Sequence, residues 1–546
     1  MNALGSSMVR AWLAAGALTA AIAAHAQTIP SVPTPSSPAP SASAPAAAAS
    51  LPQATASAPA PAPTTYVVPS VAVLATHSSN VRLGTGGPAR SDALLQVVPR
   101  VFLQSSHANW RLQGNLSANA NYYVGGEQPN AVSPLGNATL HTQWVPNLFF
   151  VDADMSAVQQ SISPYQGQGG PVQGSSYTST QWRVSPYIER LIDPGLRLLA
   201  RSDDTWTQTG NAPDGSGVSG GRYLDQHVLL QQAPRRLGYE LDLRQIYTTY
   251  DNEPYAWLRD STLRAAGSIA LAPRLVLALI GGRESVRAYS ARQDVSLYGA
   301  RLQWHPTRIG GVDATVEHRF FGTGWQLQAV GGGPRSRLSL SWSRDASSSL
   351  APLGSGVTAG DNLQGLLNSL LAGQIPDPLQ RARLVQQILG SAGLPAGLQT
   401  SGGYYMTSSV LRNDLALTGM ILRVRDTFAL TLYRNRVADL FLPGQDVLRV
   451  LQTVSNDNLQ TGFAFNYGHR LTPLDNLNIT LQQESDTGFG FNQGQSARQR
   501  ALIAQLDHRL SSRTIVLAGL RRRLLSSTRV VGGTESAVFA GLVHRF

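Results

Sequence analysis

The 546-residue sequence contains neither cysteine nor lysine. Without cysteine there is no disulfide, no thiolate metal site, no cysteine nucleophile and no lipid-modified N-terminal cysteine. Without lysine, every permanently positive side chain is an arginine, and the formal net charge is +11. This charge suits an anionic ligand or the anionic head groups of lipids. Nucleic acid is a poor partner for this chain, because its arginines form no clustered basic motif.

The sequence also lacks a catalytic constellation. Asp203 and Asp204 are adjacent, but neighbours on a strand face opposite sides and cannot share a proton. The ten histidines are scattered, without the close spacing of a zinc site. We therefore expect no enzyme, no cofactor and no metal. A hydrolase whose site is assembled from distant strands is kept as the least favoured alternative.

No apolar run reaches the length of about 18 residues that a membrane-spanning helix needs. The run from Ala11 to Ala24 is shorter, follows Arg10 and precedes the small residues of Ala24-His25-Ala26. This order predicts a secretory signal peptide over residues 1–26. Residues 27–64 are almost all proline, alanine, serine and threonine, which predicts a disordered periplasmic linker.

The stretch from Asn109 to Tyr122 alternates between apolar and polar residues. One parity holds Trp110, Leu112, Gly114, Leu116, Ala118, Ala120 and Tyr122, and the other holds Asn109, Arg111, Gln113, Asn115, Ser117, Asn119 and Asn121. Successive side chains of a strand face opposite sides, so this strand has one apolar and one polar face. With a tilt of about 45° it spans roughly 28 Å. The apolar band of an outer-membrane barrel is about 25 Å tall.

The same alternation recurs along residues 65–546, which predicts an all-β, transmembrane antiparallel β-barrel of about 22 strands, within a range of about 18 to 24. Short turn signals separate pairs of strands at a steady interval, for example at Val145-Pro146-Asn147, Asp193-Pro194-Gly195 and Thr472-Pro473-Leu474. Longer Gly/Asn/Ser-rich loops lie between them. Gln245 interrupts the apolar parity of the segment from Tyr239 to Tyr250, which predicts either a bulge or an error in the assigned register there. A soluble β-sandwich or β-helix would not require strands this long.

Residues 361–394 break the strand pattern. Leucines from Leu363 to Leu371 have helical spacing, and a second helical segment follows Asp377-Pro378. We expect a helical insertion in an extracellular loop. It either enters the lumen, with Arg381 and Arg383 as candidates for a constriction, or packs outside the mouth.

The C-terminus ends in Phe546, preceded by alternating residues. Leu542, His544 and Phe546 share one parity, and this ending resembles the signal that the β-barrel assembly machinery recognises. His544 stands where such signals usually carry an aromatic or apolar residue. We therefore expect the assembly machinery as a partner, along with outer-membrane lipid and lipopolysaccharide.

Several arginines are predicted to face the lumen, because charge on the lipid face costs about 2–4 kcal/mol near the membrane midplane. These candidates for a binding site are Arg111, Arg183, Arg197, Arg244, Arg301, Arg337 and Arg423. A ring of such arginines would favour anions. The alternative, which we weigh more heavily, is that they pair with inward acids such as Glu240 and Asp242 in a structural ladder.

Three stretches of the chain carry a family resemblance. Val68-Pro69-Ser70-Val71-Ala72-Val73 with Ser79-Asn80-Val81, Val97-Val98-Pro99-Arg100-Val101, and Ile375-Pro376-Asp377-Pro378 with Arg381 are similar to motifs of the outer-membrane proteins associated with the PEP-CTERM/exosortase system. Ser79 replaces an aspartate of the family pattern. Members of that family are encoded with exopolysaccharide genes and are expected to be barrels.

The function expected from these observations is export or surface assembly of exopolysaccharide through an outer-membrane barrel of a Gram-negative bacterium. Polysaccharide export components are then expected as partners. A general or anion-preferring porin is the main alternative, and an outer-membrane hydrolase is the third.

Overall fold

The computed structural model describes residues 64–84, 87–166, 176–193, 195–210, 219–251, 253–289, 291–307, 309–351, 408–443 and 455–546. The predicted signal peptide, the predicted linker up to residue 63 and the predicted helical insertion with Arg381 and Arg383 lie outside these residues. The described strands form one 22-stranded sheet. It closes where β1 pairs with β22, from Ser70 opposite Arg545 to Ser78 opposite Ala537. The predicted barrel of about 22 strands is therefore confirmed.

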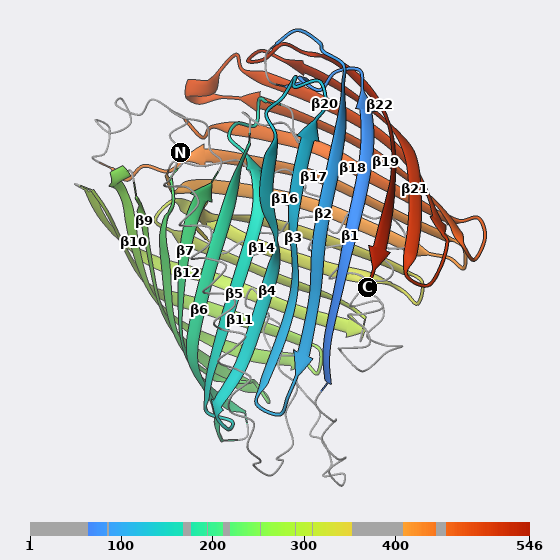
Figure 1. The fold of residues 1–546 in the computed structure, drawn as a ribbon. Coiled ribbons are helices and arrows are strands. Elements are labelled where there is room, and N and C mark those ends of the chain that lie inside the picture. Colours follow the sequence, from blue (N-terminus) through green and yellow to red (C-terminus); the bar gives the residue numbers. More distant parts are fainter. Residues whose placement is uncertain are drawn as a thin grey trace.

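Each strand pairs antiparallel with its neighbours along the chain (Figure 1). The strands are β1 (Thr64–Ser78), β2 (Asp92–Ser106), β3 (Trp110–Tyr123), β4 (Ala131–Val145), β5 (Phe149–Ser161), β6 (Ser176–Asp193), β7 (Leu196–Gly210), β8 (Gly221–Gln232), β9 (Leu237–Tyr250), β10 (Glu253–Ala272), β11 (Leu275–Ala288), β12 (Ala291–Thr307), β13 (Gly310–Arg319), β14 (Gly322–Gly333), β15 (Ser336–Ser347), β16 (Val410–Leu422), β17 (Asp426–Asp439), β18 (Asn458–Arg470), β19 (Asp475–Gly488), β20 (Ser496–Arg509), β21 (Thr514–Ser527) and β22 (Gly533–Arg545). A short 3-10 helix, η1 (Gly490–Asn492), precedes β20. Among the described residues, no helix has the length and apolar character that crossing a membrane requires.

The two ends of the barrel differ in their connections. At the turn end, β2 and β3, β4 and β5, and the other even–odd pairs are joined by short turns, and β22 ends there. At the loop end, long connections follow β1, β5, β15 and β17, although β9–β10, β11–β12 and β13–β14 are joined tightly. Barrels of this class place short turns in the periplasm and long loops outside the cell. We therefore assign the turn end to the periplasm and the loop end to the cell exterior.

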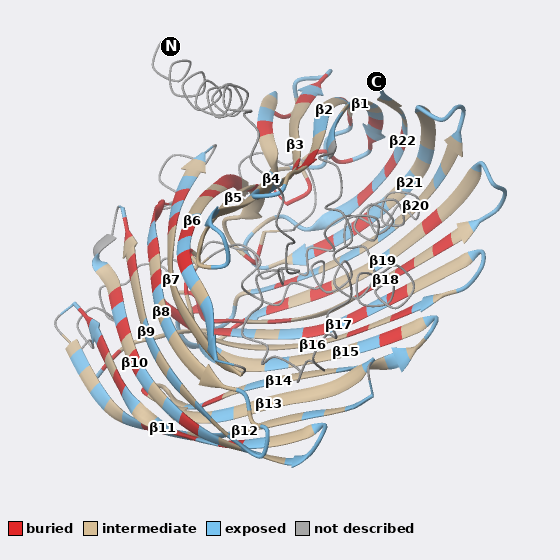
Figure 2. Ribbon diagram, turned by 90° about the horizontal axis from the view of Figure 1, so that it is seen from below, coloured by how far each residue is buried: buried red, intermediate tan, exposed pale blue. Residues whose placement is uncertain are grey.

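Side chains alternate between the lumen and the outer wall along each strand. Burial alternates accordingly along parts of strands such as β9 and β11 (Figure 2). The outer wall is apolar across its middle: Leu279 is 75% exposed, Leu520 60% and Val538 59%. Trp144 and Trp304 are exposed near the turn end. A closed barrel leaves no unpaired strand edge, and it can expose such an apolar wall to lipid. This chain is therefore an outer-membrane β-barrel of a Gram-negative bacterium.

The bulge expected at Gln245 is absent. β9 pairs in unbroken register with β8, and its pairing with β10 is also regular on both sides of Gln245. Gln245 faces outward with its neighbours Leu243 and Tyr247, and its Oε1 accepts a hydrogen bond from Arg259 at 2.7 Å. The polar residue is tolerated on the outer wall because it has a partner there.

Candidate functional site

The lumen wall of β4 to β15 is a charged ladder. Arg201 donates to Asp152 at 3.0 Å and to Asp203 at 2.8 Å, and its guanidinium lies 4.8 Å from the centre of the Tyr187 ring. His141 contacts the other carboxylate oxygen of Asp152 at 2.7 Å. Asp203 thus faces the lumen, whereas Asp204 lies on the outer wall with Arg222. The ladder links cations and acids on neighbouring strands, as expected for side chains that hold a barrel wall together.

Most of the arginines predicted to face the lumen belong to this ladder. The shortest contacts are Arg183 with Asp154 at 2.7 Å, Arg197 with Glu189 at 2.8 Å, Arg244 with Asp225 at 2.6 Å, and Arg301 with Glu240 at 3.0 Å. Arg244 and Arg301 use two nitrogens each, which fixes their orientation. His227 lies 3.3 Å from Asp242. These arginines occur as ion pairs, so they do not form a ring of free positive charge.

The deepest part of the ladder surrounds Arg319 at the end of β13. Its guanidinium donates to Asp260 at 3.0 Å, to Asp345 at 2.7 Å and to Glu284. The Glu284 side chain is fully buried and also accepts the backbone N–H of Phe320 at 2.9 Å. One arginine here neutralises carboxylates from three other strands. Its removal should therefore destabilise the barrel wall more than removal of an arginine with a single partner.

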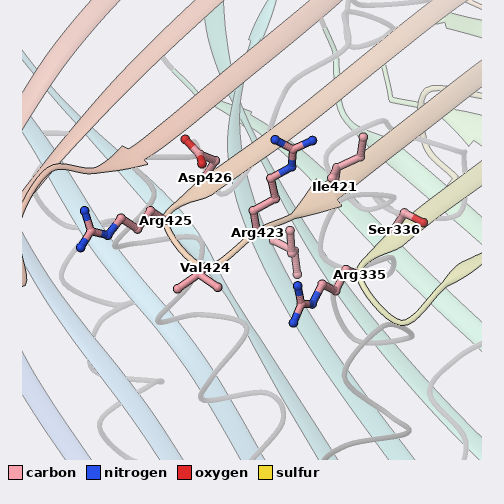
Figure 3. Close-up of a pocket in the computed structure, with 8 residues that line it drawn as sticks. Arg335, Ser336, Ile421, Arg423, Val424, Arg425 and Asp426 are labelled. Carbon is pink, nitrogen blue, oxygen red and sulfur yellow. The ribbon is translucent and has the colours of Figure 1, made fainter.

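The remaining predicted arginines are placed differently. Arg111 on β3 lies opposite His141 and is exposed. Arg337 on β15 is buried and donates to the carbonyl of Ile309 at 2.6 Å. Arg423 is not in the wall: it lies in the turn between β16 and β17. Together with Arg335 and Arg425 it lines an open cavity of about 630 Å³ (Figure 3). The predicted set is therefore not brought together at one site.

Two other parts of the lumen wall are lined mainly by neutral polar side chains, although Glu484 and Asp486 face the lumen on β19 as well. On β3 and β4 these are Gln113, Asn115, Ser117, Asn119, Asn121, Ser133, Asn137 and Thr139. On β18 and β19 they are Asn458, Gln460, Asn466, Asn476, Asn478, Thr480 and Gln482. We call these two stretches the amide walls. Amides and hydroxyls both donate and accept hydrogen bonds, as the hydroxyl groups of sugars do.

The amide walls are internally ordered. Gln96 Nε2 donates to Asn121 Oδ1 at 2.8 Å, and Thr480 Oγ1 donates to Asn466 Oδ1 at 2.8 Å. Gln460 Nε2 donates to Asp486 Oδ1 at 3.1 Å. These contacts hold the polar side chains in place along the wall.

The loop end of the lumen is narrowed by the bases of several loops. Leu350, just after β15, packs on the inward rings of Tyr223 and Tyr250, and Ser348 contacts the Tyr250 hydroxyl at 2.8 Å. Leu442, just after β17, packs on Leu258 and other inward residues of β10 and β11. These segments start on one side of the barrel and lie on the inner face of strands elsewhere in it, so the mouth is narrower than the ring of strands.

Tyr165, after β5, makes a similar link on another side of the mouth. Its hydroxyl donates to the carbonyl of Asp457 at 3.4 Å, and its own carbonyl accepts a hydrogen bond from Ser527 Oγ at 2.7 Å. Burial raises the pKa of the Tyr165 phenol above its ordinary value. The hydroxyl is therefore a donor at any physiological pH, and the link does not depend on pH.

A set of outward arginines was missed by the sequence analysis, which placed arginine in the lumen on grounds of cost. Cross-strand partners put the following arginines on the outer wall, all in the half of the strand nearer the loop end: Arg222, Arg259, Arg283, Arg287, Arg292, Arg344, Arg434, Arg436, Arg498, Arg500 and Arg522. Near the membrane interface the cost of an outward arginine falls to about 0–1 kcal/mol. The signal was present, because Arg434 and Arg436 continue the parity of Leu430 and Leu432.

The three residues of the predicted assembly signal lie together on the outer side of β22. Leu542 pairs with Val73, and His544 pairs with Val71. His544 Nδ1 lies 2.9 Å from Thr514 Oγ1, and its ring meets Phe546 edge-on at 5.0 Å. The Phe546 N–H donates to the carbonyl of Pro69 at 3.0 Å. Recognition by the assembly machinery stays a prediction.

Among the described residues there is no group of side chains that could hold a metal ion.

Comparison with known proteins gave no matching family model and no matching curated protein. Solved structures with a similar fold include the ferric enterobactin receptor of Pseudomonas aeruginosa, with 10% identity over 88% of this chain and 80% of that chain and a TM-score of 0.44. The siderophore receptor of Acinetobacter baumannii has 8% identity over 88% and 80% of the two chains and a TM-score of 0.43. OccK9 of Pseudomonas aeruginosa has 9% identity over 88% and 98% of the two chains and a TM-score of 0.34. At these identities and TM-scores, the solved structures carry no conclusion about the function of this chain.

Proposed function

We propose that this outer-membrane barrel serves the export or surface assembly of exopolysaccharide, with no enzymatic role. The observation that carries the proposal is the pair of amide walls on β3–β4 and β18–β19. A neutral polysaccharide offers many hydroxyl groups, each able to donate and accept. Such a solute is recognised best by fixed amides and hydroxyls, and only weakly by ion pairs whose charges already satisfy each other.

The resemblance to the PEP-CTERM/exosortase-associated proteins supports the same context. Its first motif lies on β1, and Asn80 follows in the connection to β2. Polysaccharide export components in the periplasm are the proposed partners, and the Pro/Ala-rich linker is the segment that would reach them.

The alternative, an anion-preferring porin, is less well supported by the lumen. Arg183, Arg197, Arg244 and Arg301 each contact a carboxylate. Paired in this way, they offer little net attraction for a passing anion. A general porin without such preference would conduct small solutes and show no affinity for a sugar chain.

Recordings of single channels in planar bilayers test the proposal, with the neutral oligosaccharide maltohexaose as probe. We expect brief interruptions of the current. Asn119→Leu in an amide wall should shorten each interruption by about two- to tenfold, which corresponds to about one lost hydrogen bond. Ala118→Leu, which faces lipid on the same strand, is the matched control. Interruption by small anions but not by maltohexaose would favour the porin instead.

A further inference from the structure

Three arginines stand side by side on the outer wall at the loop end. Arg259 on β10 lies directly opposite Arg287 on β11, and Arg287 lies directly opposite Arg292 on β12. Residues paired in this way share one face, with Cβ atoms about 5 Å apart, and like charges so placed repel each other. We call these residues the arginine row. In a folded barrel such a row is unfavourable unless an anion lies between the guanidinium groups.

The protein itself supplies little negative charge to the arginine row. Arg292 pairs with Asp294 at 2.8 Å, and both side chains remain more than half exposed. Arg259 donates only to the neutral amide of Gln245 among the described residues. Arg287 makes no ion pair among the described residues, and it is exposed, although the Asp294 carboxylate also interacts with it electrostatically. The row therefore presents more positive charge than its one acid can balance.

The position of the arginine row matches the outer edge of the membrane. Trp304, an exposed aromatic at the turn end, lies twelve residues beyond Arg292 on the same strand. At the usual rise and tilt these two residues are separated by roughly 28 Å, which is close to the height of the apolar band. The row thus lies at the level where the head groups of the outer leaflet begin.

The kinds of side chain exposed on the outer wall also differ above and below the arginine row. Below it, toward the membrane centre, Leu263 and Leu279 are exposed to the lipid, and Arg283 lies opposite Leu263. Above it, the exposed rings of Tyr255 and Tyr289 lie 4.6 Å apart. A groove of about 390 Å³, lined by Trp257 and Tyr247 among others, opens beside Arg259 and Arg287. Apolar surface, arginines and aromatic rings follow one another in the order of acyl chains, phosphates and sugars.

From this arrangement we propose that the arginine row binds the phosphate groups of lipopolysaccharide, the phosphorylated glycolipid of the outer leaflet. Each guanidinium can hold a phosphate through two parallel hydrogen bonds. A phosphate between Arg259, Arg287 and Arg292 removes the repulsion in the row. The sugars of the head group then reach the tyrosine pair, and the acyl chains cover the leucines.

The test compares the wild-type barrel with the triple variant Arg259→Gln/Arg287→Gln/Arg292→Gln, both as the full mature chain. Binding is measured in detergent with four probes: diphosphorylated lipid A, the same glycolipid without phosphates, phosphatidylglycerol and inorganic phosphate. We expect wild type to bind diphosphorylated lipid A at least tenfold more tightly than the other probes. The triple variant should lose at least tenfold of that affinity.

The matched control replaces arginines in the periplasmic turns, Arg235→Gln/Arg236→Gln/Arg335→Gln, which lowers the charge equally and should leave lipid A affinity within about twofold. The melting temperature gives a second readout. Without lipid A the triple variant should melt no lower than wild type, since repulsion is removed, and only wild type should be stabilised by lipid A. Equal lipid A affinity in both proteins, or equal affinity for the dephosphorylated glycolipid or for phosphatidylglycerol, would overturn the proposal. So would a triple variant that melts lower without any lipid.

Discussion

Several arginines of the lumen contact carboxylates, whereas Arg259 and Arg287 of the arginine row on the outer wall make no ion pair among the described residues. Arg183, Arg244 and Arg319 each contact carboxylates from other strands. On the outer wall, Arg287 has no such partner within the described residues, although it lies on the strand that carries Glu284. The same side chain is thus used in two ways. Inside the barrel it neutralises buried acids, and outside it remains available to a ligand.

The difference follows from how much water each charged group keeps in the folded barrel. An inward charge in a tightly packed ladder loses hydration and needs a partner to compensate. An outward charge at the membrane interface keeps its contact with water and head groups, so it needs none. An arginine that contacts a carboxylate therefore stabilises the barrel wall, whereas an arginine without such a contact can bind an anionic ligand.

The largest expected effect is the loss of an inner arginine. Arg319→Ala leaves Asp260 and Glu284 as uncompensated carboxylates, and should lower the free energy of unfolding by about 3–5 kcal/mol. The matched outer variant, Arg287→Ala, should change it by less than about 0.5 kcal/mol. Urea unfolding in lipid vesicles measures both. Similar losses for the two variants would mean that pairing does not distinguish the two faces.

The cost of an outward arginine should also depend on its depth in the membrane. Leu116→Arg places a charge on the outer face near the middle of β3, where it should cost about 2–4 kcal/mol, whereas Ser117→Arg points into the lumen and should be mild. The same unfolding measurement applies. Equal costs would contradict the assignment of faces, which the register of β3 with β2 and β4 supports.

A smaller effect concerns residues 361–394. The segment Ser348 to Ala351, which leads toward this insertion, lies on the inner face against Tyr223, Tyr250 and Gln181. We expect deletion of residues 361–394 to leave the barrel folded and to raise its single-channel conductance. Anion selectivity should weaken if Arg381 and Arg383 line the narrowing. Unchanged conductance and selectivity would place the insertion outside the pore.

Much of the fold could be predicted from the sequence because it depends on local patterns. The alternation of residues 109–122 defines both faces of β3, and the turn at Asp193-Pro194-Gly195 falls between β6 and β7 as expected. The prediction of a bulge at Gln245 was wrong. The side chain of Gln245 accepts a hydrogen bond from Arg259 on the next strand, and the local sequence pattern cannot reveal this partner.

The site was less predictable for the same reason. Whether Arg301 is free depends on Glu240, which lies three strands away in the barrel wall. The arginine row depends on register across β10, β11 and β12. In the sequence these residues are separated by whole strands, and only the closed sheet brings them side by side.

The most direct measurement of the role of pairing is the reversal potential of single channels under a salt gradient, for wild type and Glu240→Gln. That substitution frees Arg301 in the lumen without adding a charge. We expect weak selectivity in wild type and a shift toward anions in Glu240→Gln. Asp204→Asn, which frees Arg222 on the outer wall, should produce no shift. Strong anion selectivity in wild type, or the same reversal potential in wild type and Glu240→Gln, would contradict the account.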